Sequence, residues 1–309
     1  MRIAIFGAGG AGGHFGARLE RAGEDVVFLA RGAHLRAIRE SGLVVETPEG
    51  EIRVAPGHAT DDPAEVGPVD VILLGVKTWQ VEGAVRALRP MIGPRTFVVP
   101  LQNGVEAVDQ LIAVLGEERV VGGLCATFSF VTAPGRIRSI GSLNSIRFGE
   151  LDGRPSERTE RLRLALDRAG LQPEIVPDVQ VALWQKFLFV VSLGGVGAVT
   201  RAPIGVLREE PVTRGLVERG MREIFAVGRA QGIAIPEGSV EKSLAIVDSL
   251  APEGTSSLQR DIAEGKPSEL EAWNGAVVRR GREAGVPTPF HEIIYRRLRP
   301  LERRARQRS

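Results

Sequence analysis

Hydrophobic positions in the first part of the chain form short apolar runs separated by longer segments of helical period, the pattern of strands and helices taken in turn. An apolar run from Ile3 to Phe6 precedes a glycine-rich turn, a helical pattern that reaches Ala22, and a second run from Val26 to Leu29. This order predicts a βαβ unit, and its continuation predicts a mostly parallel sheet with helices on both faces. The later apolar runs are at residues 69–76, 96–104 and 119–131, and the helical segments between them are at 80–91 and 106–116.

Two segments of this part alternate like antiparallel strands. Residues 42–56 predict a β-excursion, and residues 135–150 predict antiparallel strands around Gly141 that extend or cap the sheet. After Pro177, where Asp178 can cap a helix, only helical periodicity remains. We therefore predict an α/β domain over residues 1–176 and an all-α domain over residues 177–309.

Composition limits the class of protein. The 309 residues are 43% hydrophobic and 25% charged with a net charge of +2, which is ordinary for two well-buried domains. The arginine-rich segment 296–309 is interpreted as a solvated helix or frayed terminus rather than a nucleic-acid arm. A single cysteine, Cys125, agrees with a reducing cytoplasm. We expect no metal site, no signal peptide and no membrane span, because the uncharged apolar run from Phe187 to Thr200 is short and interrupted by glycines.

The glycine-rich turn has the G-x-G-x-x-G spacing of a dinucleotide-binding turn. In that motif the first glycine permits a tight turn, the second lets a pyrophosphate approach the backbone, and the third lets the helix pack closely on the strand. The βαβ context favours cofactor binding over a purely structural turn. We predict that the cofactor contacts the whole turn, Gly7, Ala8, Gly9, Gly10, Ala11 and Gly12.

The ends of three strands carry the other candidate cofactor contacts. An NAD-preferring site has an acidic residue after the second strand, whereas this chain has Arg31, whose guanidinium suits the 2′-phosphate of NADP(H) unless it is simply a surface arginine. Lys77 is a second cation for that phosphate or an ordinary loop lysine. Gln102 and Asn103 follow a further strand. Asn103 either caps a helix beginning near Val105 or hydrogen-bonds nicotinamide or substrate.

A lysine stands inside the apolar stretch of residues 184–195. At helical spacing Lys186 lies away from the polar side, which holds Gln185 and Ser192. Either its stem lies along apolar surface with its head in water, or it points into the crevice between the domains as a proton donor. Four of the 40 basic residues are lysines. Because lysine can release a proton and arginine cannot, this composition favours a general acid.

Serine and glutamate residues form a second polar cluster downstream. Ser257, at the start of a helix, either caps that helix or binds a substrate carboxylate. Ser268 and Glu271 predict a capping box for the next helix. Glu269 then lies in the first helical turn, where the helix dipole stabilises a carboxylate, or it is a partner for Lys186, a water or a substrate hydroxyl.

These stretches together resemble the ketopantoate reductase family, the NADPH-dependent 2-dehydropantoate 2-reductases, over essentially the full length of the chain. The resemblance rests on the order and spacing of IAIFGAGGAGGHFGARL, FLAR, GVKTWQV, PLQNGVE, LWQKFLF, SSLQRDI and SELEAWNG. It implies a Rossmann domain followed by a helical domain, with the active site between them.

The resemblance also implies roles for individual residues. Lys186 would be the general acid that protonates the 2-keto oxygen as hydride arrives from NADPH, and Glu269 the active-site glutamate. The remaining matches are contacts: Ser257 to the substrate carboxylate, Asn103 near substrate and nicotinamide, and Arg31 with Lys77 on the adenosine 2′-phosphate.

The chain departs from the family at two positions on the lysine helix. The family commonly has an asparagine four residues after the lysine, which contacts the substrate's hydroxyl, and often another one turn later. This chain has Val190 and Gly194 there, and we predict that both belong to the substrate site. The departure implies a more apolar pocket, because a site without hydrogen-bonding groups cannot select a hydroxyl strongly.

We therefore expect NADPH-dependent reduction of a 2-keto acid, nearest to the reduction of 2-dehydropantoate (ketopantoate) to pantoate in pantothenate and coenzyme A biosynthesis. The alternatives are a related NADP-dependent dehydrogenase of a more apolar keto acid and a non-catalytic NADPH-binding sensor. The expected partner is a small keto acid, with no nucleic acid and no membrane, and the apolar helical half leaves a homodimer open.

Overall fold

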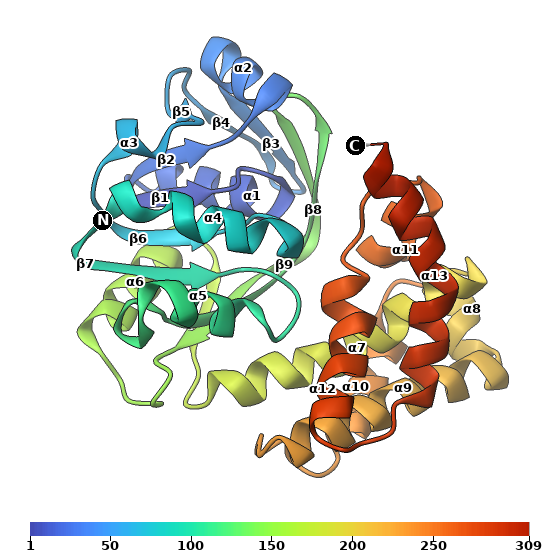
Figure 1. Ribbon diagram of the computed structural model, residues 1–309. Coiled ribbons are helices and arrows are strands. Elements are labelled where there is room, and N and C mark those ends of the chain that lie inside the picture. Colours follow the sequence, from blue (N-terminus) through green and yellow to red (C-terminus); the bar gives the residue numbers. More distant parts are fainter. Residues whose placement is uncertain (309) are drawn as a thin grey trace. The chain divides into compact units, whose positions relative to one another are not determined.

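The computed structural model describes residues 1–308 (Figure 1). The chain divides into two compact units, unit 1 with Met1–Gln102 and Ala107–Val179, and unit 2 with Asn103–Glu106 and Gln180–Ser309. All strands assigned within the described residues belong to unit 1. The predicted fold class, a Rossmann-type α/β sheet followed by an all-α region, is confirmed, and the functional boundary near residue 176 stays a prediction.

Unit 1 contains the strands and helices that the βαβ pattern predicts. Its strands are β1 (Arg2–Phe6), β2 (Asp25–Leu29), β3 (Leu43–Thr47), β4 (Gly50–Val54), β5 (Ala59–Thr60), β6 (Val69–Leu74), β7 (Ile92–Pro100), β8 (Gly122–Ala133), β9 (Arg136–Gly149) and β10 (Gln172–Ile175). Its helices are α1 (Gly10–Arg21), α2 (Gly32–Ser41), α3 (Pro63–Val66), α4 (Val81–Ala87), α5 (Ala107–Leu115) and α6 (Glu157–Arg168), with 3₁₀ turns η1 (Thr78–Gln80), η2 (Arg89–Met91) and η3 (Glu117–Arg119).

The first sheet is entirely parallel, with the strand order β5-β2-β1-β6-β7. Its strands are almost wholly apolar because both faces are covered, as the continuous hydrophobic runs predict. β1 lies between β2 and β6, and the chain order reverses around it. In sheets of this kind ligands bind outside the carboxyl ends of the strands where the order reverses, so the turns after β1, β2 and β6 surround the expected cofactor position.

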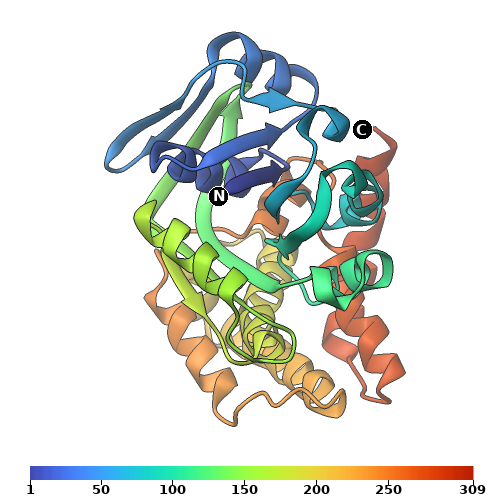
Figure 2. The ribbon, with the colours of Figure 1, turned by 90° about the vertical axis from the view of Figure 1, so that its left-hand side faces the viewer.

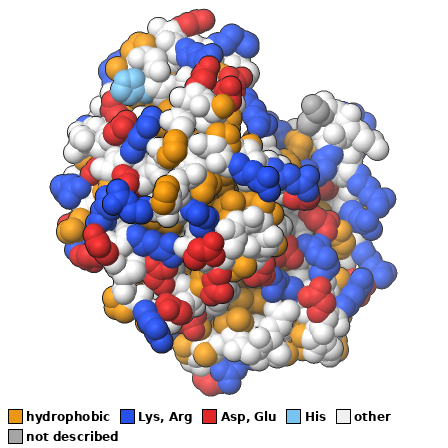
Figure 3. Space-filling model, turned by 60° about the vertical axis from the view of Figure 1, so that its left-hand side comes forward, with side chains coloured by type: hydrophobic (Ala, Val, Ile, Leu, Met, Phe, Trp, Pro, Cys, Tyr) orange, Lys and Arg blue, Asp and Glu red, His pale blue; other side chains and the backbone are white. Residues whose placement is uncertain are grey.

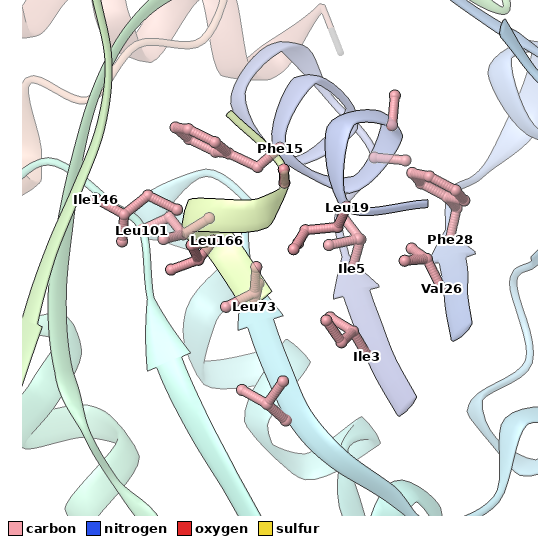
Figure 4. Close-up of a cluster of buried hydrophobic side chains, with 14 of the residues drawn as sticks. Ile3, Ile5, Phe15, Leu19, Val26, Phe28, Leu73, Leu101, Ile146 and Leu166 are labelled. Atoms are coloured by element: carbon pink, nitrogen blue, oxygen red, sulfur yellow. The ribbon is translucent and has the colours of Figure 1, made fainter. Parts of the chain in front are cut away.

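A second, mixed sheet has the order β10-β9-β3-β4, with β8 also paired to β9. Helix α1 packs against strands of both sheets and lies between them, beside the long ribbon of β8 and β9 (Figures 1 and 2). Its Phe15 and Leu19 are fully buried in the same cluster as Ile3 and Ile5 of β1 (Figure 4). This helix, which carries the glycine-rich turn at its start, is therefore fixed on two sides.

The second sheet corrects two predictions. The run that forms β8 was expected in the parallel sheet, but it pairs antiparallel with β9 and meets β7 through a single bridge, Val98 to Val120. Residues 135–150, expected to turn around Gly141, form one strand. There the register jumps so that residues 141–143 are left unpaired. The glycine permits this bulge, with φ +72°, and β8 is long enough to pair with the strand on both sides of it.

Unit 2 is built from helices, as predicted. They are α7 (Val179–Thr200), α8 (Ile204–Glu209), α9 (Pro211–Ala230), α10 (Ser239–Ser249), α11 (Ser257–Ala263), the π-helical turn η4 (Glu271–Gly275), α12 (Ala276–Glu283) and α13 (Pro289–Gln307). The arginine-rich end belongs to α13, and its Glu302 and Ala305 are buried, so it is packed on one side rather than frayed. On the face in Figure 3, basic and acidic side chains are largely interspersed.

Helix α7 alone among the described helices is long and apolar enough to cross a membrane by length and composition, and 72% of its most apolar window is buried. Buried core helices share this property. The glycines expected to interrupt its apolar run lie inside the helix. An added Cβ would come within 3 Å of Trp273 at Gly194 and of Asn274 at Gly195. The glycines therefore let neighbouring segments approach the α7 backbone closely.

Candidate active site

The three glycines of the motif have different surroundings in the glycine-rich turn. Gly7 has φ +105°, and a Cβ there would lie 2.8 Å from the Val76 nitrogen. A Cβ on Gly12 would lie 2.2 Å from the Gly7 carbonyl oxygen. At Gly9 a Cβ would meet nothing within 4 Å among the described residues. The first and third glycines are thus required by the protein itself, whereas the second faces open space, as a pyrophosphate site requires.

The backbone of this turn is anchored on one side and unpaired on the other. The N–H groups of Gly7 and Ala8 donate to the Leu29 carbonyl at 3.1 and 3.0 Å. No side chain caps α1, and its first turn has no acidic residue. Within the part of the chain that the structure describes, the N–H groups of Gly9, Gly10 and Ala11 have no backbone acceptor. With the positive end of the helix dipole, these amides fit the phosphates of a dinucleotide.

Two basic residues flank the glycine-rich turn at the carboxyl edge of the parallel sheet. Arg31 follows β2, is exposed and occupies the N-cap position of α2. Its guanidinium has no hydrogen bond or ion pair within residues 1–308. Lys77 follows β6 and is half-buried, with its ammonium 5.7 Å from the centroid of the Trp79 ring. Arg31 is thus available to an anionic ligand, and its contact with the 2′-phosphate of NADP(H) stays a prediction.

The two residues predicted after β7 differ in environment. Gln102 is buried, and its side-chain amide donates to the carbonyls of Leu74 and Val76 at 2.8 and 2.9 Å, which ties β7 to the end of β6. The prediction that Asn103 caps a helix near Val105 is wrong, because α5 begins at Ala107. Asn103 instead belongs to the short segment that clusters with unit 2. Its contact with nicotinamide or substrate stays a prediction.

In unit 2, the accessible part of α7 is a narrow stripe. Ser192, which periodicity assigned to the polar side, is fully buried, because Gly220 of α9 packs so close that a Cβ there would lie 2.9 Å from the Ser192 hydroxyl. Lys186 is half-buried, neither wholly enclosed nor in bulk solvent. Within α7 from Ala182 to Ala198, partial exposure remains at four positions, Gln185, Lys186, Phe189 and Val190.

Two predicted substrate segments meet α7 near Gly194. A Cβ on Gly194 would lie 2.7 Å from the Trp273 ring and 3.4 Å from the Ser256 hydroxyl. Ser256 caps α11 by accepting from the Gln259 N–H at 3.0 Å, so the interpretation of Ser257 as the cap is wrong and Ser257 is the first helical residue. Packing at Gly194 therefore brings together the helix of Lys186, the start of α11 and η4.

The segment around Glu269 is held by a different set of contacts from the capping box that the sequence predicts. The Ser268 N–H donates to Glu302 at 2.9 Å, and its hydroxyl donates to the same carboxylate oxygen. Glu271 accepts from Arg279 and from the Tyr295 hydroxyl. Glu302 is 34 residues away in sequence, so local spacing cannot reveal it. The Ser268 hydroxyl still accepts from the Leu270 N–H at 3.4 Å, but the capping-box prediction is wrong, because Glu302 takes the Ser268 N–H and Glu271 binds Arg279 and Tyr295 instead.

Glu269 itself is 7% exposed, and its carbonyl accepts from the Trp273 N–H at 3.0 Å just before the π-helical turn. Such turns occur often at functional sites, where the wider coil changes the direction of side chains. Arg306 of α13 pairs with Glu302 at 2.6 Å and donates to the Ser268 carbonyl at 3.1 Å. The Glu302–Arg306 pair, which sequence reasoning missed, thus fixes the backbone beside the predicted catalytic glutamate.

A buried histidine supports the other end of η4. The His291 Nδ1 accepts from the Asn274 amide at 3.0 Å, and its Nε2 donates to the Gly220 carbonyl at 3.0 Å. Burial lowers the pKa of His291 to about 4, so the ring is neutral near pH 7. Its polar contacts hold Asn274 against α7 at Gly195. These contacts link η4 to α7, α9 and α13.

Comparison with known proteins gives a consistent assignment along the chain. The family model "Ketopantoate reductase PanE/ApbA" matches residues 3–153, and "Ketopantoate reductase PanE/ApbA C terminal" matches residues 178–302. A 2-dehydropantoate 2-reductase of Mesorhizobium japonicum is 32% identical over 97% of this chain and 98% of that protein. An uncharacterized oxidoreductase of Bacillus subtilis, YkpB, is 28% identical over 98% of this chain and 99% of that protein.

Solved structures agree with this assignment. A PanE/ApbA family ketopantoate reductase from Ralstonia eutropha has a TM-score of 0.90 and 31% identity, covering 99% of this chain and 100% of that one. D-mandelate dehydrogenase, solved with NADH and anilino(oxo)acetate, has a TM-score of 0.90 at 23% identity over 99% of both chains, which shows a common fold. The glycine-rich turn of unit 1 and the matches over both halves lead to one conclusion: this chain belongs to the ketopantoate reductase family of oxidoreductases.

Proposed function

We propose that this protein reduces the keto group of a 2-keto acid with NADPH, and that the substrate is 2-dehydropantoate, reduced to pantoate for pantothenate and coenzyme A biosynthesis in the cytoplasm. The observation that carries the proposal is the accessible stripe of α7. Between Ala182 and Ala198 the rest of the helix is buried, and the one ionisable side chain in that stripe is Lys186. The relative from Mesorhizobium japonicum is named a 2-dehydropantoate 2-reductase, which supports 2-dehydropantoate as the substrate.

The chain's residues divide the reaction into binding and proton transfer. The amides of residues 9–11 hold the pyrophosphate, and Arg31 with Lys77 holds the 2′-phosphate. When bound, the nicotinamide supplies the hydride. Lys186 donates a proton to the keto oxygen as it becomes an alkoxide, Ser257 binds the substrate carboxylate, and Glu269 orients the lysine or a substrate hydroxyl. Steady-state assays with NADPH and NADH on a panel of keto acids test the whole proposal, and no oxidation of either cofactor would favour a sensor.

Replacing Arg31 with alanine is expected to weaken NADPH binding by about 10- to 100-fold and to leave NADH binding nearly unchanged, because charge-assisted hydrogen bonds to the 2′-phosphate are worth about 1.5–3 kcal/mol. Fluorescence titration with both cofactors measures the two dissociation constants. Arg36→Ala is the matched control, since Arg36 is another exposed arginine of α2. Equal losses for NADPH and NADH in Arg31→Ala would contradict the proposed selectivity.

A second candidate substrate, a more apolar 2-keto acid, is favoured by the packing at Gly194. Trp273 is 1% exposed and its ring fills the space where a side chain at position 194 would be. One turn earlier, the accessible stripe ends in Val190, which offers no hydrogen bond. At positions 190 and 194 the α7 helix itself thus offers no side chain that hydrogen-bonds a hydroxyl, and a bulky ring occupies the space that a longer polar side chain at position 194 would take.

Trimethylpyruvate separates the two candidates, because it differs from ketopantoate only in lacking the hydroxyl. If the apolar candidate is right, wild-type kcat/KM for trimethylpyruvate equals or exceeds that for ketopantoate, and Val190→Asn shifts the ratio toward ketopantoate by roughly tenfold, the value of one hydrogen bond. Initial-rate kinetics with both acids measure the ratio. Phe189→Asn on the same stripe is the control for a general loss of apolar surface. A large wild-type preference for ketopantoate would reject the apolar candidate.

A further inference from the structure

His34, in the first turn of α2, bridges two backbone segments of unit 1. Its Nε2 lies 2.8 Å from the carbonyl oxygen of Ala8 in the glycine-rich turn. The N–H of Gly135, in the turn between β8 and β9, donates to its Nδ1 at 3.0 Å. The imidazole therefore joins the start of α2, the glycine-rich turn and the β8–β9 ribbon.

The two partners fix the protonation of the ring. A backbone N–H can only donate, so the Nδ1 of His34 is the acceptor and carries no proton. A carbonyl can only accept, so Nε2 carries the proton and donates it to Ala8. The neutral Nε2–H form satisfies both contacts, and no other form does.

The bond to Ala8 controls the peptide that enters the phosphate site. A trans peptide is planar, so its C=O and the following N–H point in opposite directions. By holding the Ala8 carbonyl toward α2, His34 turns the Gly9 N–H to the opposite side. That N–H has no backbone acceptor within the described chain, and the space beside Gly9 is open.

We propose that His34 is a positioning residue for the nicotinamide dinucleotide, because it sets the Ala8–Gly9 peptide with its carbonyl away from the pyrophosphate and its N–H toward it. The inference rests on the proposed cofactor site at the glycine-rich turn. Without the imidazole, this peptide is free to rotate, and a carbonyl facing the phosphates repels them. His34 acts through the backbone of Ala8, so the proposal predicts an effect on cofactor affinity and none on the chemical step.

Two substitutions separate the two hydrogen bonds of the ring. In His34→Gln the amide nitrogen occupies the place of Nε2 and keeps a donor for Ala8. In His34→Asn the amide oxygen occupies the place of Nδ1 and keeps only the acceptor for Gly135. We expect the asparagine variant to bind NADPH about tenfold more weakly than wild type, the effect of one phosphate hydrogen bond, and the glutamine variant to stay within about threefold.

The test is a fluorescence titration of NADPH on the three full-length proteins, with thermal melting and kcat at saturating NADPH measured alongside. His58→Asn, at an exposed histidine of the same unit, is the control. Equal affinities for the asparagine and glutamine variants, whether both are intact or both reduced, would overturn the inference. If wild type itself binds neither NADPH nor NADH, the cofactor site fails and the inference with it. If wild type binds and the asparagine variant binds as tightly, the inference alone fails.

Discussion

Lys186→Ala is expected to lower kcat by at least about 100-fold, within the range of about 10²–10⁴ that a positioned general acid contributes. The reason is that the accessible stripe of α7 holds no other ionisable side chain to protonate the alkoxide. NADPH affinity should stay nearly unchanged, because the amides and basic residues proposed to bind the cofactor belong to unit 1. Single-turnover oxidation of NADPH with saturating keto acid measures the chemical step, and a binding titration measures the affinity.

Two controls make the Lys186 result specific. Lys186→Arg keeps the positive charge but cannot release its proton in a useful pH range, so it should be nearly as slow as the alanine variant. Lys242→Ala removes an exposed lysine of α10 in the same unit and should keep full activity. Full activity of the alanine variant would contradict the assignment of Lys186 as general acid. Activity of the arginine variant would indicate that the positive charge stabilises the alkoxide without donating a proton.

The parts of the site that sequence predicts well are those fixed by local backbone geometry. Gly12 is required by its contact with the Gly7 carbonyl inside the βαβ unit, and Gly7 by its positive φ, so their spacing alone indicates the turn. The same holds for Arg31, whose place after β2 follows from the strand pattern. The motif can be recognised from its local spacing, although the structure adds a long-range reason for Gly7, the close approach of Val76.

The parts that sequence misses are decided by long-range partners. Ser268 has the spacing of a capping residue, yet its hydroxyl binds Glu302, because a buried carboxylate from α13 lies within reach. The β8–β9 ribbon was misplaced for the same reason, since strand propensity does not say which sheet a strand joins. Trp273 is a third case. The sequence reveals the loss of a polar side chain at Gly194, but only the structure reveals the ring that takes its space.

These errors explain why the substrate is harder to predict from the sequence than the cofactor. The predicted cofactor contacts are mostly backbone amides in one continuous turn, whereas the predicted substrate contacts come from separate segments that meet at α7. A single replacement such as Val190 can therefore change the substrate without altering either the fold or the proton donor. The D-mandelate dehydrogenase fold, at 23% identity, shows that this architecture also occurs in a protein named for a different substrate.

Alanine at Gly12 is expected to destabilise the fold and alanine at Gly9 to leave it nearly unchanged, whereas both are expected to weaken binding of the cofactor. At Gly12 the methyl group would lie 2.2 Å from a backbone oxygen, so the turn must open, and overpacking of this kind costs about 1–3 kcal/mol of unfolding free energy. At Gly9 the methyl group meets no described protein atom within 4 Å, so stability should change by less than about 0.5 kcal/mol. Urea denaturation of both variants measures these changes.

NADPH titration completes the comparison, because both methyl groups disturb the pyrophosphate site. Gly9→Ala places its methyl in the open space proposed for the phosphates and should weaken NADPH by at least about tenfold, one lost charge-assisted hydrogen bond. Gly83→Ala is the control, because Gly83 is an exposed glycine of α4 with no neighbour within 4 Å. It should lower neither the free energy of unfolding nor the affinity for NADPH. If Gly9→Ala were as stable as wild type and bound NADPH equally well, the open space beside Gly9 would not be the phosphate site. A variant that keeps its fold and loses the cofactor is therefore the result that separates a binding turn from a structural one.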